Sequence, residues 1–252
     1  MSVRPKKHFG QHFLTNQGIV QKIIEEVKKQ QLPILEVGPG AGVLTKHLAN
    51  LPKFKCVEID TESQEHLLAS GIINEKQLIK GDFLNLPLNE VFDGESFLLL
   101  GNFPYNISTQ IVFKMLEYRA YIPTMIGMFQ KEVADRICSS NGSKQYGILS
   151  VLGQSYYQTS LLTHVEPGSF NPPPKVRSSV IALQKLNDGF ENYHQLKSLV
   201  KLAFNQRRKT LKNSLKAGVD ISPIENSRYL TLRPEQLSVK DFQDLTITLN
   251  AS

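Results

Sequence analysis

The sequence of 252 residues lacks most of the features that mark secreted, membrane-bound or metal-binding proteins. Tryptophan is absent, and only two cysteines occur, Cys56 and Cys138, so we expect no disulfide and no cysteine metal cluster in a cytoplasmic protein. The six histidines show no ligand spacing, which predicts no metal site. No apolar run approaches the length of a membrane span, and the N-terminus shows no signal-peptide core, so we expect no membrane association.

One stretch also lacks acidic residues. Between Glu191 and Asp220 all the charged side chains are basic: Lys197, Lys201, Arg207, Arg208, Lys209, Lys212 and Lys216. The net charge of the chain is +6, and a field of one sign fits a polyanion such as RNA, because phosphate contacts release counterions. The alternative is the solvated outer side of a helix, since an apolar stripe runs through the same region: Leu196, Val200, Phe204, Leu211 and Leu215.

What the sequence does contain is an alternation of short apolar runs and helical segments, which is typical of an α/β fold with a parallel sheet. Beyond a basic N-terminal arm we expect a helix at 16–31, a strand at 125–129, a helix at 131–139, and two antiparallel strands at 147–158 and 178–185. A turn-rich junction at 186–189 precedes a small helical region that ends near 237–249. The sequence therefore predicts two domains, residues 1–186 and 187–252.

A glycine-rich turn follows the first apolar run. The segment 36–42 (EVGPGAG) comes after 33–35 (PIL) and leads into a helical segment, so it reads as a strand, a turn and a helix. Gly38 and Gly40 let the backbone approach a ligand at a helix N-terminus. Val43 stands where a dinucleotide fingerprint has its third glycine, which favours a smaller adenosine-bearing cofactor.

Acidic residues stand at the ends of the next two expected strands. Glu58 lies twenty residues after Gly38, where a carboxylate accepts from ribose hydroxyls. Asp82 follows a third strand and can accept from the adenine amino group, while Phe83 can pack beside the ring. Each acidic residue taken singly is better explained by a solvated turn, but successive strand ends with suitable groups favour a ligand site.

The segment 102–105 (NFPY) directly follows the apolar run 97–101 (FLLLG). The amide oxygen of Asn102 and a main-chain carbonyl can accept two N–H bonds, Pro104 stiffens the turn, and Tyr105 offers a face for stacking. These groups can hold a flat ring that bears an amino group and can make its delocalised nitrogen more pyramidal and nucleophilic. The alternative is an ordinary Asn-Pro turn after a strand.

Taken in order, several segments resemble the motifs of the ribosomal RNA adenine N6-dimethyltransferases. They are 11–14 (QHFL), 36–40 (EVGPG), 57–60 (VEID), 81–82 (GD), 102–108 (NFPYNIS), 170–176 (FNPPPKV), 203–215 (AFNQRRKTLKNSL) and 233–237 (RPEQL). The last two resemble the small-subunit (16S) branch. The resemblance runs from residue 9 to 242, with two departures: His12 stands where Asn is usual, and Phe103 where Leu is usual.

The resemblance implies a Rossmann-like methyltransferase with a small all-α C-terminal domain that uses S-adenosyl-L-methionine. Its implied activity is dimethylation, at N6, of two adjacent adenosines in the loop of the 3′-terminal hairpin of 16S rRNA. The implied partner is that rRNA within the pre-30S small ribosomal subunit, with the enzyme acting as a cytoplasmic monomer in ribosome biogenesis.

The resemblance also assigns roles to individual residues. Those expected at the chemical step are Asn102, Pro104 and Tyr105. Those expected to hold the cofactor are His12, Leu14, Gly38, Gly40, Glu58, Asp82, Phe83 and again Asn102. Those expected to contact RNA are Lys175, Arg207, Arg208 and Lys209.

Three other functions remain open at this stage. A DNA adenine methyltransferase uses a similar tetrapeptide, but with two prolines, and this chain has no evident sequence-reading module. A large-subunit resistance methyltransferase is the second, and it would differ only in the ribosomal particle that serves as its substrate. A non-enzymatic assembly or transcription factor built on a retired methylase is the third, although the intact Asn102 and acidic positions argue against it.

Overall fold

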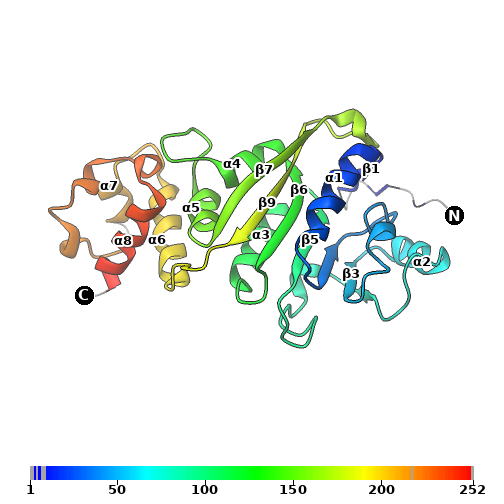
Figure 1. Ribbon diagram of the computed structural model, residues 1–252. Helices are drawn as coiled ribbons and strands as arrows, with labels where there is room; N and C mark the ends of the chain where they lie inside the picture. Colours follow the sequence, from blue (N-terminus) through cyan, green and yellow to red (C-terminus); the bar gives the residue numbers. More distant parts are fainter. Residues whose placement is uncertain (1–2, 4, 7–9, 217, 251–252) are drawn as a thin grey trace. The chain divides into compact units, whose positions relative to one another are not determined.

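The computed structural model describes residues 3, 5–6, 10–216 and 218–250, and these form two compact units (Figure 1). The first unit is Met1–Ala134 with Ser160–Lys185, and the second is Asp135–Thr159 with Leu186–Ser252. The chain therefore changes unit near residue 186, where the sequence predicts a boundary, and also leaves and re-enters the first unit around Asp135–Thr159. That excursion belongs with the C-terminal part because its helix α5 (Ile148–Gln154) packs against helices α6 and α8.

A seven-stranded sheet in the order β4-β3-β2-β5-β6-β9-β7 forms the framework. The strands are β2 (Ile34–Val37), β3 (Phe54–Glu58), β4 (Leu78–Lys80), β5 (Leu98–Asn102), β6 (Thr124–Gln130), β7 (Tyr157–Val165) and β9 (Ser178–Lys185). Strands β2 to β6 pair in parallel, and β9 runs antiparallel to β6. Because β3 and β5 flank β2 on opposite sides, the strand order reverses beside β2, and ligands of open α/β sheets bind at such a reversal.

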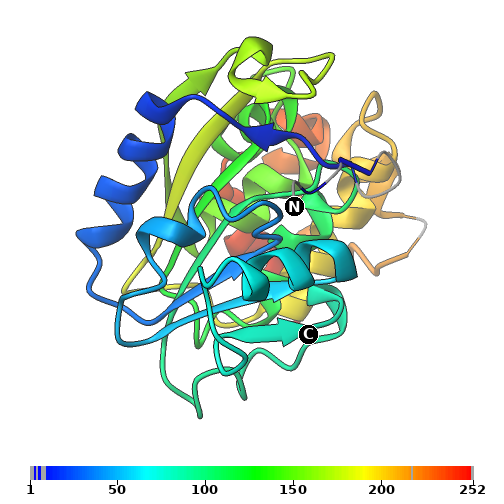
Figure 2. The same ribbon diagram turned by 90° about the vertical axis from the view of Figure 1, so that its right-hand side faces the viewer.

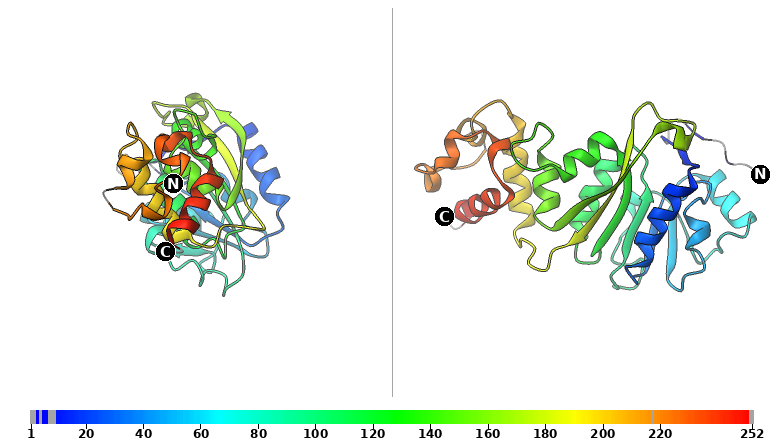
Figure 3. Two further views of the ribbon diagram at one scale, coloured as in Figure 1. Left: turned by 90° about the vertical axis from the view of Figure 1, so that its left-hand side faces the viewer. Right: turned by 45° about the horizontal axis from the view of Figure 1, so that its top comes forward.

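Helices cover both faces of the sheet (Figures 1 and 3). The helical elements of this part are α1 (Gln17–Lys28), η2 (Thr45–His47), α2 (Thr61–Ala69), η3 (Phe83–Asn85), α3 (Ser108–Glu117) and the first half of α4 (Lys131–Cys138), which continues into the second unit. Helix α1 begins at Asn16, whose side chain accepts from the N–H groups of Gly18 and Ile19, as an N-cap does. The expected helix at 16–31 is thus confirmed, with a slightly earlier end.

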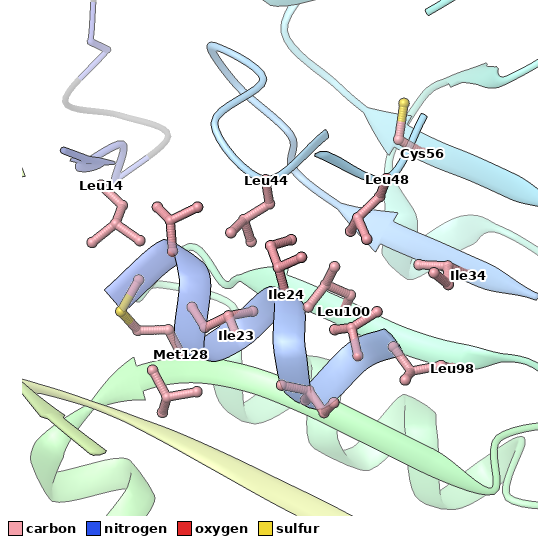
Figure 4. Close-up of a cluster of buried hydrophobic side chains, with 14 of the residues drawn as sticks. Leu14, Ile23, Ile24, Ile34, Leu44, Leu48, Cys56, Leu98, Leu100 and Met128 are labelled. Carbon is pink, nitrogen blue, oxygen red and sulfur yellow. The ribbon is translucent and has the colours of Figure 1, made fainter. Parts of the chain in front are cut away.

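The core under α1 follows from two sequence periods. Ile23 and Ile24 belong to the buried face of the amphipathic helix and point towards the sheet in Figure 4. Leu98 and Leu100 of β5 join the same cluster, because alternate residues of a strand share one face. Leu99 is equally buried and faces the other side, where α3 lies.

A small two-stranded ribbon joins distant parts of the chain. Strand β1 (Phe13–Leu14) pairs antiparallel with β8 (Phe170–Asn171), which follows η4 (Pro167–Ser169). Figure 2 shows the blue segment with β1 running to the yellow-green segment with β8. This pairing connects positions almost 160 residues apart, and no local sequence signal predicts it.

The expected strand at 147–158 is wrong. Residues Ile148–Gln154 form helix α5, and the strand that joins the sheet is β7, which begins at Tyr157. A short, wholly buried apolar run has no clear period, so it fits a strand and a buried helix equally well. The side chain of Ser150 stabilises the start of the helix, because its hydroxyl accepts from the N–H of Gly147 and donates to the carbonyl of Arg136.

The second unit is helical, as the sequence predicts for its C-terminal part. Besides α5 it contains α6 (Tyr193–Asn205), α7 (Leu211–Leu215), η5 (Ser222–Ile224), η6 (Arg228–Thr231), η7 (Pro234–Gln236) and α8 (Val239–Asn250). Its later helices are drawn in orange and red in Figure 3. The apolar stripe is confirmed, with four of its members fully buried: Leu196, Val200, Leu211 and Leu215.

The described residues contain neither a membrane-spanning helix nor a cluster of metal ligands. None of the helices described is long and apolar enough to cross a membrane. No three His, Cys, Asp or Glu side chains among those described lie together as a metal ion would require.

Candidate active site

A cavity of about 320 Å³ opens at the carboxyl ends of the central parallel strands. It is lined by the segment before β1, the glycine turn after β2, and the ends of β3, β4 and β5. The sequence singled out these residues of its lining: His12, Gly38, Gly40, Glu58, Asp82, Phe83, Asn102, Pro104 and Tyr105. Residues expected at the cofactor and residues expected at the target base therefore share one cavity.

The glycine turn needs its glycines. Gly38 and Gly40 have φ angles of +67° and +54°, a region that other residues rarely adopt. A Cβ on Gly40 would lie 2.7 Å from the ring of Phe13, and one on Gly38 would lie 3.8 Å from Pro104. The turn thus faces the tetrapeptide 102–105 and presents bare backbone to the cavity.

Glu58 ends β3 with its carboxylate held in place. One oxygen accepts from the N–H of Gly40 at 3.0 Å, and the other accepts from the N–H groups of Ile59 and Asp60 at 2.9 Å. Burial raises the pKa of this carboxyl, and the three N–H donors oppose that rise. The oxygen that accepts only from Gly40 keeps capacity for a further hydrogen bond, such as one from a ribose hydroxyl.

Asp82 and Phe83 close the far end of the cavity. The carboxylate of Asp82 accepts from the N–H of Leu84 at 2.9 Å and so caps η3. Phe83 is buried, and Lys114 of α3 holds the same turn by donating to the carbonyl of Leu84 at 2.7 Å. The amine of Lys114 also lies 5.5 Å from the centroid of the Phe83 ring, a cation–π distance.

Lys114 was not expected at the site. Burial lowers its pKa, and sequence reasoning missed it because it stands among the apolar residues of an amphipathic helix. A lysine with its amine turned onto a loop carbonyl cannot be told from a surface lysine by sequence alone.

Asp60 ties the N-terminal segment to the end of β3. Its carboxylate accepts from the amine of Lys6, from the hydroxyl of Ser63 at 2.9 Å and from the amide of Gln11 at 3.4 Å. Burial alone would raise the pKa of Asp60, but these donors outweigh it and lower the pKa. The cavity wall that contains Gln11 is thereby fixed to the sheet.

Asn102 is held by a single main-chain acceptor. Its Nδ2 donates to the carbonyl of His12 at 2.8 Å, which leaves Oδ1 as the acceptor of this amide. Pro104 faces the glycine turn, and its carbonyl accepts from the N–H of Ile107 at 3.2 Å, which uses one of its two lone pairs.

Tyr105 is held from two sides. Its hydroxyl and that of Ser178, the first residue of β9, lie 2.6 Å apart in a hydrogen bond. Its ring stacks with the ring of His12, with 5.4 Å between the centroids and 29° between the planes. Burial raises the pKa of the Tyr105 hydroxyl, so this group stays protonated at neutral pH. No sequence motif indicated a role for Ser178 at this position.

Phe103 is the anchor of the tetrapeptide. Its ring is buried over Gly101 of β5 and Gly127 of β6, which are directly paired in the sheet. A Cβ on Gly101 would lie 2.6 Å from the ring, and one on Gly127 would overlap it. The two glycines make room for a residue larger than the Leu that is usual at this position.

Leu14 and the residues expected to contact RNA lie elsewhere. The side chain of Leu14 is buried in the core under α1, so only its main chain is available to a ligand. Lys175 is exposed on the loop between β8 and β9. Arg208 and Lys209 are exposed in the second unit, after α6.

Arg207 differs from its neighbours because it has partners within the second unit. Its side chain lies 4.0 Å from the carboxylate of Glu235 and donates to the carbonyl of Ser143 at 3.4 Å. These contacts give Arg207 a structural role that the run of basic residues did not reveal.

The sheet order, the glycine turn, the acidic strand ends and the tetrapeptide in one cavity define a Rossmann-like methyltransferase, which confirms the predicted α/β class. The ribosomal RNA adenine dimethylase family model matches residues 3–231. The chain belongs to this family and is an adenine methyltransferase.

Relatives agree over nearly the whole chain. The ribosomal RNA small subunit methyltransferase A of Bacteroides thetaiotaomicron is 49% identical over 97% of this chain and 93% of its own length. That of Phocaeicola vulgatus is 48% identical over 99% and 91%. Two solved structures are also similar. A dimethyladenosine transferase from Plasmodium falciparum has a TM-score of 0.79 at 26% identity, covering 95% of this chain and 98% of its own. The 23S rRNA methyltransferase ErmE has 0.64 at 25% identity, covering 94% and 99%.

Proposed function

We propose that the protein transfers methyl groups from S-adenosyl-L-methionine to the N6 amines of two adjacent adenosines in the loop of the 3′-terminal hairpin of 16S rRNA. It does so on the immature small ribosomal subunit, as a cytoplasmic monomer, during ribosome biogenesis. The observation that carries the proposal is Asn102, whose amide is oriented by the His12 carbonyl in the same cavity as the glycine turn.

The residues present fit the cofactor. Gly38 and Gly40 supply a backbone cradle that a side chain would fill, and Glu58 supplies an oriented acceptor for ribose hydroxyls. Asp82 and Phe83 can hold the adenine ring at the far end. Bound S-adenosyl-L-methionine supplies an electrophilic sulfonium methyl group, so alignment of the amine contributes more to the rate than a general base does.

The tetrapeptide would bind the target adenine after the base leaves its stack. The Oδ1 atom of Asn102 and the remaining lone pair of the Pro104 carbonyl accept the two N–H bonds of the amine. This arrangement favours a pyramidal nitrogen whose lone pair is free to attack. The ring of Tyr105 supports one face of the base.

The second methylation makes different demands on the same groups. The monomethylated amine keeps one N–H, so one of the two acceptors becomes redundant. The cavity then has to admit the first methyl group beside Asn102 or Pro104, and the remaining N–H pairs with the other acceptor.

The small ribosomal subunit is proposed as the substrate particle because of the names of the relatives and the distribution of charge. The curated relatives are named for the small subunit, which favours it over the 23S rRNA for which ErmE is named. Arg208, Lys209 and Lys175 are exposed and can contact phosphates. Arg207 contributes chiefly by holding the segment that carries Arg208 and Lys209.

The substitution Asn102→Ala tests the assignment of the tetrapeptide. It removes the Oδ1 acceptor and leaves the glycine turn and Glu58 untouched. We expect S-adenosyl-L-methionine affinity, measured by calorimetry, to stay within severalfold, and methyl transfer to immature small subunits to fall by about 100-fold or more.

The matched control is Asn89→Ala, which removes the same side chain from an exposed loop outside the cavity and should behave as wild type. Near-wild-type transfer by Asn102→Ala would refute the role of Asn102. Parallel reactions with duplex DNA and with large subunits distinguish the other methyltransferases, since methylation of either in preference to the small subunit would contradict the proposed substrate.

A further inference from the structure

His12 touches three parts of the site at once. Its main-chain carbonyl accepts from Nδ2 of Asn102, its ring stacks on Tyr105, and its Nδ1 lies 2.8 Å from the carbonyl oxygen of Pro172. A carbonyl oxygen can only accept, so Nδ1 of His12 carries the hydrogen and donates. One residue therefore joins the tetrapeptide to the proline loop.

The β1–β8 ribbon fixes this position. Phe13 of β1 pairs with Asn171 of β8, so the residues just outside the ribbon, His12 and Pro172, face each other. The N–H of Thr15 donates to the carbonyl of Ser169 at 2.8 Å and anchors the other end. The backbone of residue 12 is thus set by the fold, whatever its side chain.

The backbone and the side chain of His12 have separate tasks. The bond to Asn102 uses only the main-chain carbonyl, which any residue would supply. The ring, by contrast, stacks on the ring of Tyr105 and donates to the carbonyl of Pro172 in the proline loop, and the proposed function places both of these groups beside the target base. With its hydroxyl bonded to Ser178 and its ring stacked on His12, Tyr105 is held in one plane.

We propose that the His12 side chain is a positioning residue of the target-base slot: it orients Tyr105 and fixes the proline loop, and it does not bind the cofactor. The inference rests on the proposed function, and it replaces the cofactor role that the family motif implies for this position. Because the family's usual Asn cannot stack in this way, the arrangement is a property of the histidine.

Three variants separate the two contacts of the ring. His12→Phe keeps a ring to stack on Tyr105 but loses the N–H donor, His12→Asn keeps a donor but loses the ring, and His12→Ala loses both. The control is His66→Ala, which removes a partly buried histidine of α2 that does not line the cavity. Melting temperatures identify any variant that is merely unfolded.

The measurements are S-adenosyl-L-methionine affinity by calorimetry, the single-turnover rate on immature small subunits, and the ratio of monomethyl- to dimethyladenosine by mass spectrometry. We expect His12→Ala to leave the affinity within about threefold of wild type and to slow transfer by about tenfold to 100-fold, with monomethyladenosine accumulating. His12→Phe and His12→Asn should each recover part of the rate.

Three results would overturn the inference. If His12→Ala lost as much cofactor affinity as methyl-transfer rate, the side chain of His12 would be assigned to cofactor binding. An unchanged rate and affinity in His12→Ala would show that the ring has no role in methyl transfer. An equally low rate in all three variants would show that the stacking on Tyr105 and the bond to Pro172 do not contribute separately. Wild-type protein that methylates no ribosomal particle would instead refute the proposed function itself, and this inference with it.

Discussion

Two buried glutamates on neighbouring strands, Glu58 at the cavity and Glu36 within the sheet, have their carboxyl groups held by different partners. Glu58 accepts from three main-chain N–H groups at the edge of the cavity. Glu36, in the middle of β2, accepts from the hydroxyl of Thr45 at 2.8 Å. Burial raises the pKa of Glu36 to about 8, against the lowering effect of that hydrogen bond. Glu36 therefore holds the turn region through Thr45 in a largely neutral form.

The raised pKa of Glu36 predicts a pH-dependent stability. Between the unfolded pKa and about 8 the folded state binds more protons than the unfolded state, so the free energy of unfolding falls as the pH rises. The slope contributed by this group is at most about 1.4 kcal/mol per pH unit. Glu36→Gln keeps an acceptor for Thr45 without a proton to lose, and it should be more stable than wild type at about pH 8 but similar at about pH 5.

Denaturant unfolding across that pH range measures the effect. Glu90→Gln, at an exposed position, is the control and should keep the wild-type slope. An unchanged slope in Glu36→Gln would mean that Glu36 is ionised in the folded protein.

Single residues were predicted best where strand ends fix their position. Glu58, Asp82 and Asn102 follow apolar runs, and the parallel sheet brings their positions to one edge. The side chains that hold Leu84 and Tyr105 were not predictable, because Lys114 and Ser178 belong to elements distant in sequence.

At the scale of elements, the pairing of β5 with β6 positions the tetrapeptide. Gly101 and Gly127 lie opposite each other, and the ring of Phe103 fills the space above them, 5.1 Å from the ring of Phe129. The residue that follows Asn102 in the chain is thereby fixed to the sheet, and Asn102 with it.

Gly127→Ala should displace that anchor. The added methyl overlaps the Phe103 ring, so we expect about 1–3 kcal/mol of destabilisation together with slower methyl transfer. Phe103→Leu, which restores the usual family residue, should cost less than the glycine substitution. The double variant should be more active than Gly127→Ala alone, because the smaller side chain relieves the overlap.

Unfolding midpoints and single-turnover rates of the three variants measure this coupling. Additive losses in the double variant would show that the ring and Gly127 do not interact. Gly168→Ala, at a glycine with open space around it, is the control and should lose little.

Elements with a clear period were predictable, and those set by distant partners were not. The amphipathic pattern of α1 and the parallel strands around β2 follow from local sequence. The β1–β8 ribbon does not follow from local sequence, because it depends on pairing between distant residues. Helix α5 does not either, because its apolar run has no clear period and fits both a strand and a buried helix.

At the scale of the whole molecule, the candidate active site and the basic stretch belong to different units of the chain. The first unit holds the cavity, and the second holds the stretch without acidic residues. The sequence revealed this charge run but not which of its members are free to bind RNA. Only the structure shows that Arg207 contacts Glu235 and Ser143, whereas Arg208 and Lys209 are exposed.

Charge reversal at Arg208 and Lys209 together should weaken binding to small-subunit rRNA by about tenfold or more and reduce its salt dependence, while cofactor affinity stays at the wild-type value. The control is reversal of Lys22 and Lys76, two exposed lysines of the first unit, which changes the net charge equally. Filter binding at several salt concentrations and calorimetry provide the measurements. Equal losses in both double variants would assign the effect to net charge.

Mass spectrometry of small-subunit rRNA from cells that lack the protein tests the central claim most directly, namely that methyl donor and adenine amine meet in the cavity between the glycine turn and Asn102. We predict that dimethyladenosine disappears from the two adjacent positions, returns with the wild-type chain, and does not return with Asn102→Ala. Full dimethylation without the protein, or its restoration by the Asn102→Ala chain, would contradict the account.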